Sequence, residues 1–166
     1  MYTSIAEFEE EWFQEAVLTQ KVLAALTDTS LQQVSPGGRT LGRIAWHTVI
    51  NIPKYLNQFG VAIEVVKDDA DVPSSAKEIA ETFREVSANA TAKVQQQWTE
   101  ETLKQVQNAF GRNLPNASIL SLLLKHIIHH RGQMTVLMRQ AGLPVPGVYG
   151  PSKEEWSRIG QDPPTI

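Results

Sequence analysis

Three of the four histidines in this chain lie in one short stretch, at positions 126, 129 and 130. In a helix, positions four apart lie about 40° apart around the axis and one turn apart along it, so His126 and His130 would present their imidazoles to the same point. Two imidazoles placed in this way can bind one metal ion, but a working site needs at least one more ligand. The fourth histidine, His47, could complete a three-histidine site if the two helices that carry these residues face each other.

Three further residues near these histidines could assist an ion or a substrate. Gln133 lies three positions after His130, on the same helical face, where it could hydrogen-bond a ligand, a bound water or a neighbouring helix. His129 could be a fourth ligand or a proton shuttle, or it could simply flank the site. Arg43, one turn before His47, could hold an anionic substrate group or remain solvated.

The two residues after His130 are interpreted structurally. Arg131 should point about 100° away from His130, which favours an ion pair or a subunit contact. Gly132 lowers helix stability by roughly 1 kcal/mol, so we expect it to permit a close helix approach or to leave room beside the metal.

Carboxylates are missing from the segments that carry the histidines. No aspartate or glutamate occurs from Thr40 to Ala62 or from Asn113 to Tyr149. The His-Glu-x-x-His motif of zincin peptidases and the Glu-x-x-His motif of di-iron bundles are therefore both absent. A neutral three-histidine set would favour hydroxide, a carboxylate from another helix, or an anionic substrate such as a thiolate. The available glutamates are expected on solvated faces: Glu7, Glu11, Glu15, Glu81 and Glu85.

Four amphipathic segments could position these residues. They are predicted as helices over 3–27, 41–59, 76–98 and 117–141. Ser4, Thr40, Ser75 and Asn116 are the expected N-caps. Pro53 cannot donate to the helix ladder, so it predicts a kink or break near residue 52. Gly142 and Pro144 should end the last helix.

The connections complete the predicted fold. Residues 60–74 form a connection, residues 99–115 fit a short strand or a helical turn equally well, and 152–155 should cap a short helix that holds Trp156. Four long helices with mixed connections predict an all-α four-helix bundle with a long crossover connection and a short C-terminal helical segment. The 166 residues suit a single domain over 1–166.

Composition excludes several classes of protein. The net charge is −3 and no dense lysine or arginine block exists, so neither nucleic acid nor an anionic membrane is an expected partner. No cysteine occurs, which excludes disulfides, thiolate ligands and a cysteine nucleophile, so thiol chemistry would need a thiol from a substrate. No apolar run of about 18 residues and no signal peptide is found, which makes the cytoplasm the expected location.

The histidine pattern resembles that of the DinB/YfiT-like family of bundle proteins. The resemblance is carried by Trp46-His47 and by the run His126 to Gln133, and the stretch from Ala141 to Gly150 is similar to the family's ending after its last helix. It covers essentially the whole chain. It implies a four-helix bundle, frequent homodimers and one divalent metal ion on three histidines, which match His47, His126 and His130.

The resemblance also implies a range of functions. Members of this kind include thiol-dependent S-transferases and metal-dependent hydrolases. We expect a metal-dependent enzyme that activates a small thiol cosubstrate of low molecular weight. The alternatives are a hydrolase that uses metal-bound water, a non-enzymatic metal-binding stress-response protein, and a bundle that binds no metal. Imidazole suits zinc, nickel, iron and copper alike, so the sequence leaves the metal open.

Overall fold

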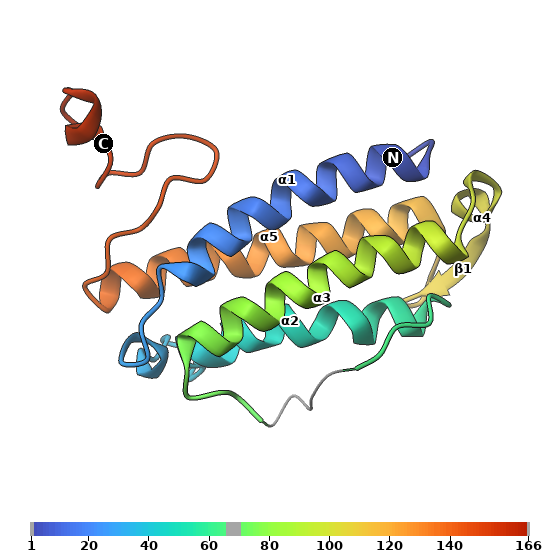
Figure 1. Ribbon diagram of the computed structural model, residues 1–166, viewed down its shortest axis with the longest axis horizontal. Coiled ribbons are helices and arrows are strands. Elements are labelled where there is room, and N and C mark those ends of the chain that lie inside the picture. The colour runs from blue at the N-terminus through green and yellow to red at the C-terminus, as the bar shows by residue number, and fades with distance from the viewer. Residues whose placement is uncertain (1, 66–70, 166) are drawn as a thin grey trace.

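The fold is described by a computed structural model, which covers residues 2–65 and 71–165. Four long helices lie alongside one another, as Figure 1 shows. They are α1 (Ile5–Ala24), α2 (Leu41–Gln58), α3 (Ala76–Gln97) and α5 (Asn116–Gln140). The predicted all-α bundle is therefore confirmed, with each helix close to its predicted limits.

Three of the four predicted N-caps are confirmed. The side-chain oxygens of Ser4, Thr40 and Ser75 each accept a hydrogen bond from the backbone N–H three residues further on, which satisfies one of the free amides at a helix start. The fourth prediction is wrong, because Pro115 is the N-cap of α5 and Asn116 is its first helical residue. The buried Asn116 amide instead joins α5 to the segment before it through the Thr102 carbonyl and the Gln107 side chain.

Each long helix packs against two others. Helices α1 and α2 both contact α3 and α5, so the four helices form a ring around one apolar core. Helices α2 and α3 run in the same direction, and the chain must therefore return along the bundle between them (Figure 1). This is the predicted long crossover connection. Residues 66–70 of the predicted 60–74 segment lie outside the described residues.

Helix α2 is continuous at Pro53, where a kink or break was predicted, so the predicted break is wrong. Pro53 lies inside the helix, which continues through it to Gln58. A proline within a helix removes one backbone hydrogen bond and clashes with the preceding turn, a destabilisation of about 3 kcal/mol. Here Ile52, Pro53 and Leu56 are all buried, and this core packing offsets the loss.

Residues 99–115, for which the sequence allowed either a short strand or a helical turn, contain both kinds of structure. A short helix, α4 (Glu100–Lys104), precedes a hairpin of β1 (Val106–Ala109) and β2 (Arg112–Pro115), which are antiparallel. The two turn residues, Phe110 and Gly111, have φ values of 54° and 76°, as a tight hairpin turn of the favoured hand requires.

Two short 3-10 helices complete the chain. They are η1 (Ser30–Gln32) and η2 (Trp156–Ile159). The predicted cap of the C-terminal segment is wrong: η2 has Glu155 at its N-cap position and no side-chain capping bond. The Glu155 carboxylate instead accepts hydrogen bonds from the backbone N–H groups of Gly147 and Ser152, and so folds the tail on itself.

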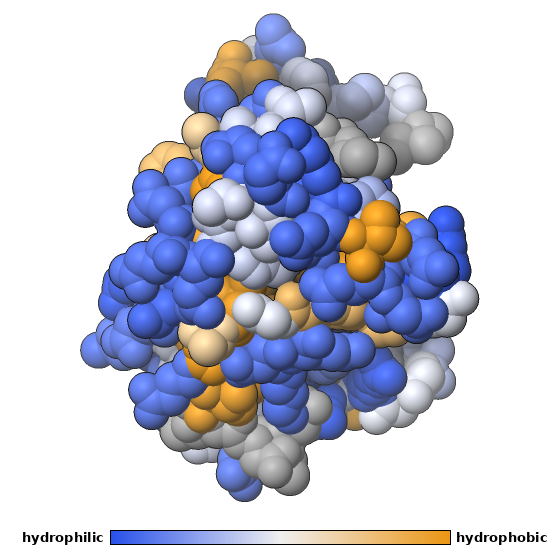
Figure 2. Space-filling model, turned by 90° about the vertical axis from the view of Figure 1, so that its right-hand side faces the viewer, coloured by the Kyte–Doolittle hydropathy of each residue, from blue (hydrophilic) through white to orange (hydrophobic). Residues whose placement is uncertain are grey.

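Polar side chains cover most of the hairpin end of the bundle, and apolar residues show there only as small separate patches (Figure 2). Among the described residues, no helix combines the length and apolar character needed to cross a membrane. Large apolar side chains are exposed both in the hairpin, at Val106 and Phe110, and along the bundle, where Phe13 and Val17 lie on α1.

Candidate metal centre

Three histidines meet between α2 and α5. The Nε2 atom of His126 lies 3.1 Å from Nε2 of His47 and 3.1 Å from Nε2 of His130. Ligand atoms of all three residues lie within 4.8 Å of one another. The structure thus brings together the three residues that spacing and resemblance pointed to, two from one helix and one from its neighbour.

These distances suit a shared metal ion. Nitrogen atoms bound at 2.0–2.1 Å around a tetrahedral ion are about 3.3 Å apart. The donor set is imidazole alone, which accepts zinc, nickel, iron or copper. Three protein ligands would leave at least one position for water or substrate, as in catalytic rather than structural sites.

Gln133 fixes the tautomer of His130. Its Oε1 lies 2.8 Å from His130 Nδ1. Because an amide oxygen only accepts hydrogen bonds, Nδ1 must carry the proton, which leaves the Nε2 lone pair free to bind a metal. The Gln133 Nε2 donates to Nε2 of His129 at 3.1 Å. The side chain therefore links an inner and an outer imidazole.

The surroundings favour the neutral form of His126 and His130. Burial, with smaller contributions from the three neighbouring histidines, lowers the pKa of His126 to about 4. Burial also lowers the pKa of His130, and the charge of Arg39 contributes a smaller part. Neutral imidazole is the form that binds metals, so these shifts favour metal binding near pH 7. His130 is buried, whereas His47 and His126 are half-buried, so the cluster opens to solvent on one side.

Three other residues that the sequence suggested near the metal site do not belong to the three-histidine group. His129 is exposed, and the three-histidine group does not include it, although its ring centroid lies 5.1 Å from that of His130. Arg43 is half-buried and lines a separate pocket between η1 and residues 72–74. Gly132 is exposed, and a Cβ there would meet no heavy atom within 4 Å, so the expected close helix approach is wrong.

Arg131 forms the predicted ion pair, with an unexpected partner. Its Nη2 lies 2.7 Å from Glu15 Oε2, and its Nη1 donates to the Glu15 carbonyl and to Thr19 Oγ1. The expectation that Glu15 is solvated is wrong, because only 8% of it is exposed. The sequence carried a signal: positions 8, 12, 15, 19 and 22 follow the helical spacing of the buried stripe, and Glu15 occupies one of them.

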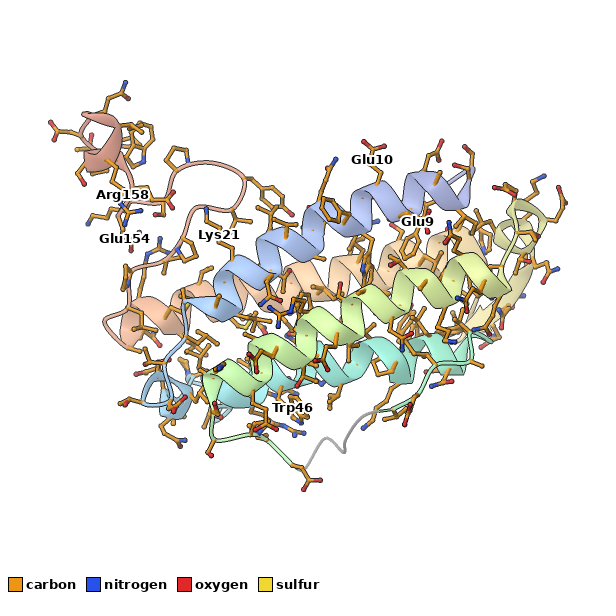
Figure 3. The ribbon with its side chains drawn as sticks, viewed as in Figure 1. Glu9, Glu10, Lys21, Trp46, Glu154 and Arg158 are labelled. Carbon is orange, nitrogen blue, oxygen red and sulfur yellow. The ribbon has the colours of Figure 1, made fainter. Side chains whose placement is uncertain are left out.

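The tail closes this network. The Tyr149 hydroxyl donates to the Glu15 carboxylate at about 3.0 Å and accepts from Arg131 Nη2. Lys21 extends from α1 toward the same tail, where its Nζ donates to the Gly147 carbonyl (Figure 3). The residue directly after His130 thus anchors both α1 and the C-terminal segment to α5.

The fold and the cluster define an all-α bundle with a candidate histidine metal centre between its second and last long helices. The family model of the DinB family matches residues 1–163. The chain therefore belongs to the DinB family.

Known relatives agree with this assignment. The uncharacterized protein YrdA of Bacillus subtilis (strain 168) is 45% identical over the full length of both chains. The crystal structure of a DinB-like protein from Bacillus cereus ATCC 10987 superposes with a TM-score of 0.84 at 49% identity, covering 90% of this chain and all of that one. YjoA of B. subtilis, at 18% identity and a TM-score of 0.62 over 83% of this chain and 95% of its own, shares the fold.

Proposed function

We propose that this protein binds one divalent metal ion through His47, His126 and His130, and that it is a metal-dependent enzyme acting on a small thiol cosubstrate. The observation that carries the proposal is the convergence of three histidine Nε2 atoms. The hydrogen bond from His130 to Gln133 sets the tautomer of one of these histidines. A hydrogen bond of this kind orients a ligating imidazole and raises its affinity for metal.

The residues around the cluster favour a thiol. A divalent ion on three neutral imidazoles lowers the pKa of a thiol or water molecule that binds it. The chain has no cysteine, so the thiol must come from a cosubstrate. Hydrolysis would gain from a carboxylate base, which neither α2 nor α5 supplies. Transfer to or from sulfur is therefore ranked above hydrolysis. The exposed His129 is joined to His130 through the Gln133 amide.

Metal content tests the site. Untagged protein analysed by elemental analysis should hold about one divalent ion per chain, and His126→Asn and His130→Asn variants should lose it. His129→Asn is the matched control, since it removes a histidine of the same helix from outside the group, and it should retain the ion. Wild-type metal content in the first two variants would refute the assignment.

Turnover tests the reaction. Metal-loaded protein is incubated with an electrophile such as 1-chloro-2,4-dinitrobenzene, with and without low-molecular-weight thiols, and with an activated ester. Thiol-dependent consumption of the electrophile that His126→Asn abolishes would support S-transfer. Ester cleavage without thiol would indicate a hydrolase. Bound metal with neither activity would favour a non-enzymatic metal-binding protein.

We propose further that the protein is a homodimer that uses the α1–α3 face. An open groove of about 510 Å³ runs between these helices, and two of its lining residues, Phe13 and Val17, are 69% and 51% exposed. The groove also carries Glu9 on α1 and Arg84 on α3, so a two-fold packing could pair opposite charges. Phe13→Asp should give monomers in analytical ultracentrifugation, whereas Phe110→Asp, an equally exposed aromatic in the hairpin turn, should not.

A further inference from the structure

A second open pocket lies one helical turn from the histidine cluster. Its volume is about 470 Å³, and it lies between the loop at 35–39 and the last turns of α5. Ile44 lies three residues before His47, and Gln133 three after His130, so both bring the pocket next to the cluster. Arg39 is its one charged lining residue.

The loop fixes the backbone of Arg39. Ser35 N–H donates to the Arg39 carbonyl at 2.8 Å, and Arg39 N–H donates to Ser35 Oγ at 3.1 Å. Gly38 permits the turn because its φ is +81°, a conformation that a side chain would strain. The arginine is therefore presented by a closed turn at the start of α2.

The lining of this pocket favours an anion, because the described residues that form it include one arginine and no carboxylate. No aspartate or glutamate occurs between Thr29 and Ile63 or between Thr102 and Lys153. Among the residues that the structure describes, no carboxylate pairs with the Arg39 guanidinium. The N-terminal end of the α2 helix dipole adds positive potential beside it.

We infer that this pocket, which we call the Arg39 pocket, binds a carboxylate group of the small thiol cosubstrate, with the Arg39 guanidinium as its anchor. A single guanidinium matches a carboxylate in charge and can bind both of its oxygens at once. The sulfur would then lie toward the histidines and the carboxylate toward the loop. This inference rests on the proposed function, because the pocket itself selects only the carboxylate end of the cosubstrate, and the thiol at the other end comes from that proposal.

Binding of matched thiols tests the inference by calorimetry, without any turnover. The probes are ω-mercaptocarboxylates of three to six carbons, each compared with its neutral amide, on zinc-loaded protein. At least one carboxylate should bind about tenfold to a hundredfold more tightly than its amide, the size expected for a charge-assisted hydrogen bond. Arg39→Gln should remove this preference, and Arg39→Lys should retain only part of it.

The control variant is Arg112→Gln, which removes an equally exposed arginine from β2 at the other end of the bundle. It should keep the wild-type preference for carboxylates. An unchanged preference in Arg39→Gln, or none in the wild type, would overturn the inference. The proposed function fails separately, if neither member of any pair binds more tightly to zinc-loaded than to metal-free protein.

Discussion

Removing the charge of Glu15 should destabilise the bundle strongly. The Arg131 side chain is 2% exposed and that of Glu15 11% exposed, so the pair is almost fully withdrawn from water. Glu15→Gln keeps the shape of the side chain but leaves the guanidinium as an unbalanced buried charge. Breaking a buried pair in this way typically costs about 3–5 kcal/mol of unfolding free energy.

Two features of the structure place the expected loss of unfolding free energy at the lower end of this range. Arg131 would keep its hydrogen bonds to the Glu15 carbonyl, Thr19 and Tyr149. Tyr149 is 70% exposed and lies over the pair, so water is close to the charge once its partner is lost. We therefore expect a loss of about 3 kcal/mol, or roughly 6–12 °C in Tm for a chain of this size.

Urea unfolding followed by circular dichroism measures this loss. The matched control is Glu81→Gln, which breaks the Lys77–Glu81 pair, whose side chains are 83% and 46% exposed. An exposed pair of this kind should contribute less than about 0.5 kcal/mol. The double variant Glu15→Leu with Arg131→Met leaves no unpaired charge and should be more stable than Glu15→Gln alone.

Two results would refute this reasoning. A loss below about 1 kcal/mol in Glu15→Gln would mean that solvent compensates the guanidinium, so that the pair behaves like an exposed one. A double variant less stable than Glu15→Gln would mean that the hydrogen bonds of Arg131, rather than charge balance, stabilise this part of the bundle.

Three further predictions concern α5. Gln133→Leu should lower metal affinity about tenfold to a hundredfold, measured by chelator competition, because His130 loses the partner that fixes its tautomer. Metal-free protein should lose stability as pH falls from 6.5 towards 4: the pKa of His126 is about 4 when folded and near 6.5 when unfolded, so the unfolded chain binds more protons in this window. His126→Asn should flatten that slope, and an unchanged slope would contradict the shift. Gly132→Ala should raise the unfolding free energy by roughly 1 kcal/mol, since the added methyl has space; a loss would show a close approach after all.

The sequence predicted the helices well because local chemistry specifies them. Ser4, Thr40 and Ser75 cap the helices that were predicted to begin after them, through short-range hydrogen bonds that need no knowledge of the fold. Pro53 shows the limit of such reasoning. Its local effect is to break a helix, but burial of the residues around it reverses the outcome, and burial depends on the tertiary structure.

The histidine cluster was predictable for a different reason. The spacing of His126 and His130 guarantees that both reach one point, whatever the rest of the chain does. That His47 joins them depends on α2 and α5 being neighbours, which spacing cannot give and only the resemblance suggested. No sequence pattern indicated that Arg39 lies beside the cluster, because its position depends on a turn closed by Ser35 and Gly38.

Glu15 was misjudged because its charge was given more weight than its position. A glutamate on a predicted surface helix is usually solvated, yet this one lies on the buried stripe, where only a partner could keep it charged. That partner is Arg131, which follows His130 and points about 100° away from it around α5. One turn of α5 thus contacts α2 through an imidazole and α1 through a guanidinium. Because consecutive side chains of a helix keep a fixed angle, α5 cannot rotate to move His130 away from His47 without also breaking the buried ion pair. The same contact that stabilises the bundle therefore holds the histidines in register.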